Sequence, residues 1–235
     1  MNDLGTMLWK EFTEFFGNRR SLRVFGLAII LMAVLPIFIA SKSNHVTAAV
    51  LPIFMLIYVN FAALITTAQT GTDSVLHERA SHTLETLLAT RLPDRVLFGG
   101  KVLATVILGY LSAIVTLALQ EVGLNLFGKA HGIIGFQSTV NVLLFLVAPL
   151  LLTAYLATVA VFVGLRVSDQ RSAYLLTMVS ILVLALPVIL HLVHLHLTLS
   201  WVRSAILVVL ILDIVLVRLG IALFRRDRLV LYLQD

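Results

Sequence analysis

The sequence has no cysteine and very few charged residues. Cysteine is absent from all 235 positions, which excludes disulfide bonds, thiolate metal sites and cysteine nucleophiles. Only 12% of the residues are Asp, Glu, Lys or Arg, against about 25% in a typical soluble domain. Because 60% of the residues are hydrophobic, the chain lacks the polar surface of an ordinary soluble domain. We therefore expect an integral membrane protein.

The charged residues that are present carry a net charge of +5, but they form no basic patch with interleaved aromatic side chains. A nucleic-acid-binding surface usually shows such a patch, and we expect no nucleic-acid partner. The Lys and Arg residues stand instead at the ends of long apolar segments. This placement is typical of residues that set membrane topology.

Six apolar segments are long enough to cross a bilayer, which takes about 20 residues of helix. We expect spans at residues 22–40, 46–70, 96–120, 140–165, 172–190 and 201–224. Six spans use roughly half of the chain and leave only short links between them. The sequence thus predicts one all-α, polytopic membrane domain over residues 1–235, with no soluble catalytic domain.

The basic residues predict the orientation of these spans. With the N-terminus inside, only Lys42, Lys129 and Arg203 of the 17 Lys and Arg residues fall on the exterior side. The remaining 14 fall on the cytoplasmic side, as the positive-inside rule requires. Both termini are therefore expected to be cytoplasmic.

Residues 1–21 precede the first span and read as an amphipathic helix. Leu4, Leu8, Phe12, Phe15 and Phe16 share one helical stripe, and charged residues occupy the other faces. We expect an interfacial helix that lies on the bilayer with this stripe in the headgroup region. The polar section is too long for a cleavable signal peptide, so the helix is expected to be retained.

The segment 73–101 is the longest polar stretch. Its apolar residues recur at steps of three and four, which predicts a second amphipathic helix that lies in the cytoplasm and is too charged to cross lipid. Asp73 and Ser74 suit the N-cap of this helix, and Pro93 suits its end. The apolar stripe is Leu76, Ala80, Leu84, Leu87, Leu88 and Leu92, and the other faces carry Glu78, Arg79, His82, Glu85 and Arg91.

Two patterns near this segment resemble catalytic motifs but lack essential residues. A phosphate-binding loop needs Gly five residues before the Gly-Lys pair and Ser or Thr after the Lys, whereas Arg95 and Val102 flank Gly100-Lys101. Zinc-protease helices carry two His four residues apart, whereas His77 and His82 are five apart. We expect no enzyme activity or metal site here, and we expect Lys101 to extend to the membrane interface.

Three histidines, His191, His194 and His196, stand at an expected exterior span end. Their spacing does not align all three on one helix face, which favours interfacial packing over a metal or pH sensor. Asp213 is the clearest charge within a span, where a carboxylate is costly and faces the bundle interior or a water cavity. Asp213 could bond to a neighbouring span, line a translocation path, or bind a proton or sodium ion. An ion-coupled secondary transporter or channel centred on Asp213 therefore stays an alternative function.

The polar segment resembles a known family. Glu78-Arg79, Thr83-Leu84-Glu85, Leu87-Leu88-Ala89-Thr90 and Gly100-Lys101 are similar to the cytoplasmic loop of six-span permeases of the second export class of ABC transporters. The turn at 166–171 and the tail at 224–229 are similar too. The chain departs from the family at His82, where Gly is usual, and at Pro93, which lies further from Arg91. The link at 191–200 is also too short for the family's re-entrant exterior hairpin.

The resemblance implies a coupling helix within residues 73–95 that docks in a groove of a separate ATP-binding subunit. Glu78, Arg79, Glu85 and Arg91 would form the docking surface, while Leu84, Leu87 and Leu88 would pack on the bundle. It further implies an N-terminal elbow helix, two permease subunits as a homodimer, and two ATP-binding subunits that hold ATP and Mg²⁺. No cofactor is expected in this chain itself. The expected role is alternating-access export of a hydrophobic or amphipathic substrate across a prokaryotic plasma membrane.

Overall fold

The computed structural model describes residues 3–42, 51–81, 83, 93–127, 139–167, 169–192 and 199–223. All regular structure within these ranges is helical, which confirms the predicted all-α class. The helices are α1 (Asp3–Gly17), α2 (Arg19–Lys42), α3 (Leu51–Ala80), α5 (Asp94–Phe127), α6 (Thr139–Val142), η1 (Leu143–Val147), α7 (Ala148–Arg166), α8 (Gln170–Leu192) and α9 (Leu199–Leu223).

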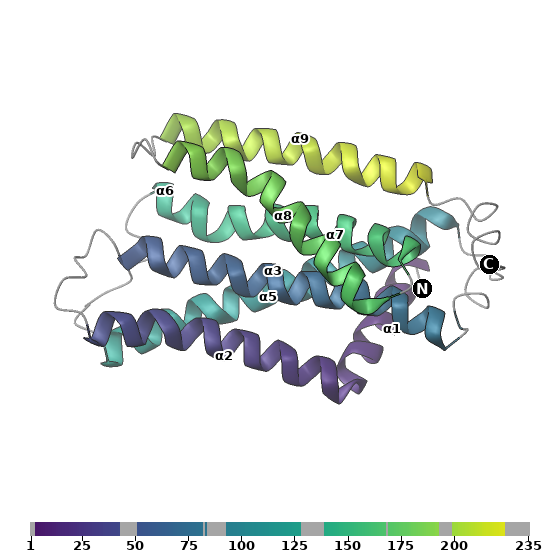
Figure 1. Ribbon diagram of the computed structural model, residues 1–235, viewed down its shortest axis with the longest axis horizontal. Coiled ribbons are helices and arrows are strands. Elements are labelled where there is room, and N and C mark those ends of the chain that lie inside the picture. Colours follow the sequence, from purple (N-terminus) through teal and green to yellow (C-terminus); the bar gives the residue numbers. More distant parts are fainter. Residues whose placement is uncertain are drawn as a thin grey trace.

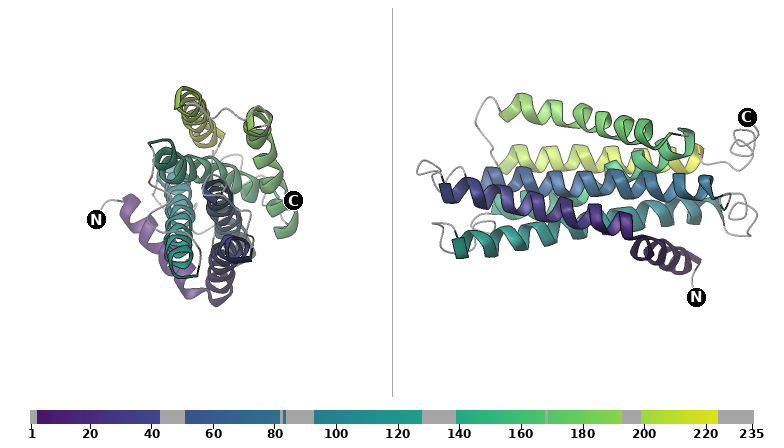
Figure 2. Two further views of the ribbon diagram at one scale, coloured as in Figure 1. Left: turned by 90° about the vertical axis from the view of Figure 1, so that its left-hand side faces the viewer. Right: turned by 60° about the horizontal axis from the view of Figure 1, so that its bottom comes forward.

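The long helices run side by side along one axis, and α1 lies at an angle across one end (Figures 1 and 2). The helix α3 is central, because it packs against α2, α5, α7 and α8. In the described ranges five helices are long and apolar enough to cross a membrane, within α2, α3, α5, the continuous η1 and α7, and α9. The chain is therefore membrane-embedded. The fifth expected span coincides with α8, which has 23 residues but is not among these five.

Small residues allow α3, α5 and α7 to approach closely. A Cβ atom added to Gly109 would lie 1.9 Å from Thr67 Oγ1, and one added to Gly71 would lie 2.6 Å from Ala160 Cβ. Helices in lipid associate through such close packing, since burial of apolar surface gives little driving force there. This three-helix contact forms the centre of the bundle.

Buried hydroxyl groups in this centre are satisfied mainly within their own helices. Each donates to a carbonyl three or four residues earlier, as seen for Thr66, Thr67, Thr70, Thr72, Thr158 and Thr177. The hydroxyls of Thr66 and Ser112 also meet across α3 and α5 at 2.7 Å. These threonines thus solve the problem that unpaired polar groups are costly in hydrocarbon.

Two prolines alter the backbone of the spans, each with a compensating contact. Pro149 follows the π-helical turn η1, in which Ala148 N–H donates to Leu143 O five residues earlier. A wider turn suits this position, because proline cannot donate to Phe145 O and its ring crowds that carbonyl. Pro36 lies inside α2 and cannot donate to Met32 O, but the side-chain amide of Gln120 donates to that carbonyl at 3.0 Å.

Replacement of the fully buried Gln120 by Leu should destabilise the protein by about 1–3 kcal/mol, because Met32 O loses its side-chain donor in an apolar setting. In a Pro36→Ala background the backbone N–H of residue 36 can bond to Met32 O, so the same change should cost clearly less. Unfolding of the detergent-solubilised single and double variants measures this coupling. Equal costs in both backgrounds would contradict the assignment.

The predicted separate helix from 74 to 92 is wrong at its start. The helix α3 continues without interruption to Ala80, and Asp73 and Ser74 lie inside it rather than at an N-cap. No break separates Asp73 and Ser74 from the earlier part of α3, and Gly71, just before them, packs against α7. The bundle contacts of α3 therefore set which face of residues 73–80 points inward. That face carries Val75 and Glu78, while Ala80 of the predicted apolar stripe is exposed.

The face of α1 that meets the bundle differs in part from the apolar stripe that is predicted to face the headgroup region. The inward face of α1 carries Met7, Glu11 and Phe15 at four-residue steps, whereas Leu4 and Phe16 are exposed. Met7 packs against Gly100 of α5, with its Cγ atom 2.6 Å from the position of an added Cβ. The contact with α5 fixes the rotation of α1 about its own axis, and this rotation brings the charged Glu11 into the interior.

Candidate functional site

Five charged side chains meet where α1, α3 and α5 come together at one end of the bundle. Lys10, Glu11 and Glu14 belong to α1, Glu78 to α3 and Lys101 to α5. We call this group the ion-pair cluster. Glu78 is 1% exposed, Lys101 3% and Glu11 6%, so most of the cluster is removed from solvent. Charged groups almost never occupy such positions unless they are paired.

Lys101 is the centre of the ion-pair cluster. Its Nζ lies 2.8 Å from Glu11 Oε1 and 2.8 Å from Glu78 Oε2, and it also donates to Ser74 O at 3.2 Å. One ammonium group therefore joins all three helices. It donates hydrogen bonds to Glu11 Oε1 and Ser74 O, whereas its contact with Glu78 Oε2 is an ion pair.

Lys10 is the second cation of the cluster and is half-buried. It pairs with Glu78 and lies 3.0 Å from Glu14 Oε1. Burial lowers the pKa of Lys10, but the hydrogen bond and charge of Glu78, with Glu11 and Glu14, raise it, and the net pKa is above the ordinary 10.5. Lys10 is therefore charged at neutral pH.

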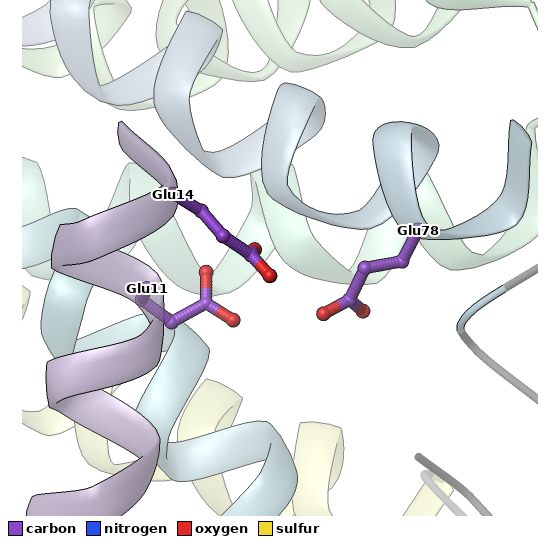
Figure 3. Close-up of side chains that lie close together, drawn as sticks. All are labelled: Glu11, Glu14 and Glu78. Atoms are coloured by element: carbon purple, nitrogen blue, oxygen red, sulfur yellow. The ribbon is translucent and has the colours of Figure 1, made fainter. Parts of the chain in front are cut away.

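The three carboxylates of the cluster point toward one another (Figure 3). Candidate ligand atoms of Glu11, Glu14 and Glu78 lie within 4.8 Å of each other, a spacing that could suit a metal ion. The ammonium groups of Lys10 and Lys101, however, already lie against these oxygens and supply the opposite charge. We interpret the group as ion pairs rather than as a metal centre.

The end of α3 is fastened on its other side as well. The guanidinium of Arg79 donates to Val167 O at 3.2 Å and to Leu165 O at 3.5 Å. These carbonyls belong to the C-terminal end of α7, where a cation also complements the helix dipole. The half-buried Arg79 thus holds α3 against α7.

The start of α8 is tied to the same region. Asp169 Oδ2 accepts hydrogen bonds from Ser172 N at 2.8 Å and Ser172 Oγ at 2.7 Å, as an N-cap does. These bonds lower the pKa of Asp169. Next to it, the side-chain amide of Gln170 donates to Asp73 Oδ1 of α3. The ends of four long helices are therefore connected near the segment that follows α3.

The structure changes the interpretation of two predicted docking residues. The expected exposure of Glu78 is wrong, because this carboxylate is buried against two lysines. Arg79 is bound within the chain. The other predicted contacts, Glu85 and Arg91 for docking and Leu84, Leu87 and Leu88 for packing, lie outside the described residues.

Sequence reasoning missed the partners of Glu78. Lys101 is predicted to extend to the membrane interface, but it is buried and paired with Glu11 and Glu78. One signal was available, since acidic and basic residues near positions 10, 78 and 101 all fall at the same predicted end of the spans. The sequence did not indicate which of them would pair.

Asp213 lies on α9 and is 6% exposed, which agrees with its expected inward orientation. Neither of its carboxylate oxygens has a hydrogen-bond partner among the described residues. Most neighbouring side chains along α9 are exposed, as expected for a helix at the edge of a membrane bundle. The side chain of His191, and all of His194 and His196, lie outside the described residues.

Taken together, these features define a membrane-embedded, all-helical protein whose ion-pair cluster connects three helices at one end of the bundle. No family model matches the chain, and no curated protein is significantly similar to it.

Proposed function

We propose that the chain is the membrane-spanning permease subunit of an ATP-driven exporter. The observation that carries the proposal is the fastening of α3 at Glu78 and Arg79, within the predicted coupling segment 73–95. Glu78 connects the end of α3 to α1 and α5, and Arg79 connects it to α7. The proposal also rests on the similarity of residues 78–101 to the cytoplasmic loop of the six-span export permeases.

This arrangement suits the transmission of force. A segment that leaves α3 at Ser81 starts three residues after Glu78, and a continuous helix resists bending over that distance. A push on the segment would move α3, and the ion pairs and the Arg79 contacts would carry the movement to α1, α5 and α7. Alternating access requires such joint displacement of packed helices.

The proposed complex contains two copies of the chain and two ATP-binding subunits, which hold ATP and Mg²⁺. Glu85 and Arg91 are the proposed docking residues, and Glu78 acts within the chain as the link to the bundle. In this complex α8 is the fifth of six spans, α1 is the elbow helix and both termini are cytoplasmic in a prokaryotic plasma membrane. The substrate is hydrophobic or amphipathic, in keeping with mostly apolar spans.

Charge reversal at Glu85 should release the ATP-binding subunit. We expect a near-stoichiometric ATP-binding protein, with ATPase activity, to co-purify with the tagged chain from its native membrane in mild detergent. Glu85→Arg should lose both, because the reversed charge opposes the groups that docked the carboxylate. The matched control is Glu121→Arg. It also reverses an acidic charge, but near the C-terminal end of α5, and it should keep the ATP-binding subunit.

A chain that purifies alone, without ATPase activity, would contradict the exporter proposal. The second candidate, an ion-coupled carrier or channel, would then be favoured by the buried carboxylate of Asp213, which has no hydrogen-bond partner within the part of the chain that the structure describes. An intramembrane carboxylate of this kind is a common feature of ion pathways.

A further inference from the structure

A cavity of about 320 Å³ lies beside the ion-pair cluster, at the corner between α1 and α2. Its wall is formed by these two helices together with α3, α5 and the start of α8. The volume is near the lower end of the range for small-molecule sites in proteins. The cavity is thus large enough to hold a compact polar group.

Charges of both signs line this cavity. Glu11, Glu14 and Asp73 supply carboxylates, and Arg20 supplies a guanidinium group. Glu11 is neutralised by Lys101 at 2.8 Å, whereas Glu14 is more exposed and shares Lys10 with Glu78. The lining therefore presents carboxylates at Glu14 and Asp73 and a cationic group at Arg20, with the imidazole of His77 also in the wall. A ligand with a positive and a negative group fits it better than a simple anion or cation.

The start of α2 is not itself an open anion site. Asn18 Oδ1 already accepts from the backbone N–H of Arg20 at 3.0 Å and of Ser21 at 3.4 Å. The helix is therefore capped by its own chain. An acidic group of a ligand would depend on the Arg20 side chain.

The surroundings of the cavity are those of a membrane interface. Arg19, Arg20 and Arg23 stand at the start of α2, and Trp9 of α1 is 72% exposed. Basic and Trp side chains typically gather at headgroup level. Beyond Arg20, on the same face of α2, Leu27 and Leu31 are exposed at steps that follow the helical repeat. An amphipathic ligand could place its polar end in the cavity and its acyl chains along these leucines.

We propose that this cavity binds the headgroup of a zwitterionic phospholipid that carries a primary ammonium group. The ammonium donates N–H hydrogen bonds to Glu14 and Asp73, and the phosphate pairs with Arg20. A quaternary ammonium headgroup has no N–H to donate. A purely anionic headgroup would bring a further negative charge beside Glu14 and Asp73 and would carry no group that donates to them. The site requires neither an ATP-binding partner nor transport.

Lipid retention tests the proposal. The full chain is reconstituted in vesicles with equal amounts of phosphatidylethanolamine, phosphatidylglycerol and phosphatidylcholine, extracted in mild detergent, and its bound lipids are measured by native mass spectrometry. We expect selective retention of phosphatidylethanolamine. Glu14→Gln should reduce this selectivity about tenfold, as expected for the loss of a hydrogen bond to a charged group. The control Glu121→Gln, the same change at the far end of α5, should leave it intact.

Equal retention of the three lipids would indicate only annular lipid and would overturn the proposal, as would a preference for phosphatidylglycerol. Thermal unfolding of each variant checks that the fold survives. If Glu14→Gln unfolds through its contact with Lys10, Asp73→Asn serves as the second variant, because Asp73 is held by Gln170 on the other side of the cavity. Selectivity that persists in a folded variant contradicts the assigned contacts.

Discussion

Replacement of Lys101 by Met is expected to destabilise the protein by about 3–5 kcal/mol, the cost of leaving buried charges without their partner. The two carboxylates that Lys101 holds at 2.8 Å, Glu11 and Glu78, are almost fully buried. Lys10 could compensate only in part, since it is already shared among several carboxylates. Unfolding of the purified chain in detergent, followed by circular dichroism, measures the loss.

The matched control for this prediction is Lys42→Met. Lys42 ends α2 at the opposite end of the bundle, where it is exposed and its ammonium lies 5.1 Å above the ring of Phe38. Its loss should cost less than about 1 kcal/mol. The double variant Lys101→Met with Glu11→Leu should recover part of the stability, because one of the two stranded carboxylates is removed. If Lys101→Met proves as mild as Lys42→Met, the cluster does not hold the three helices together.

Replacement of Gly109 by Ala is expected to cost about 1–3 kcal/mol or more through overpacking between α3 and α5. The added Cβ would meet Thr67 Oγ1 at 1.9 Å and Thr153 Cγ2 at 3.1 Å. Thr67 cannot easily give way, because its hydroxyl donates to Ala63 O and its side chain is fully buried. The helices must therefore separate, which also weakens the contact between Thr66 and Ser112.

Gly99 on the same helix is the control for Gly109. Nothing lies within 4 Å of a Cβ at Gly99, so Gly99→Ala should be neutral or should stabilise by up to about 1 kcal/mol through helix propensity. Thr67→Ala should rescue Gly109→Ala, since it removes the nearest atom. Opposite signs for the two glycines, measured by thermal unfolding, are the expected result. A similar effect at both positions would show that close packing of α3 on α5 is not what Gly109 provides.

The ion-pair cluster also changes how the proposed coupling would work. The sequence predicts a separate amphipathic helix that docks on its partner through four residues, Glu78, Arg79, Glu85 and Arg91. In the structure, Glu78 and Arg79 bind within the chain, and α3 ends at Ala80, two residues after Glu78. The proposed force would therefore enter the bundle through the end of α3, and Glu85 and Arg91, which lie outside the described residues, would be the residues that meet the ATP-binding subunit.

Much of the fold could be predicted from the sequence because its signals are local. A run of apolar residues bounded by Arg, Lys or Pro predicts a helix of nearly the observed length. The predicted span 22–40 lies within α2, and the predicted span 201–224 overlaps almost all of α9. The inward orientation of Asp213 followed from the cost of a carboxylate in lipid. The sequence does not reveal that α3 runs unbroken from Thr70 to Ala80, because polar residues there also suit the start of a new helix.

The sequence by itself determined that this chain is helical, apolar and membrane-embedded, and that most of its charges lie at the ends of its spans. Only the tertiary structure decided which charges are buried and which helices they join. Helical periodicity places Glu78, Glu11 and Lys101 on faces of their own helices, but their burial depends on the rotation of each helix against its neighbours. That rotation is set by close contacts such as Met7 on Gly100 and Val75 on Gly164, between residues far apart in the chain.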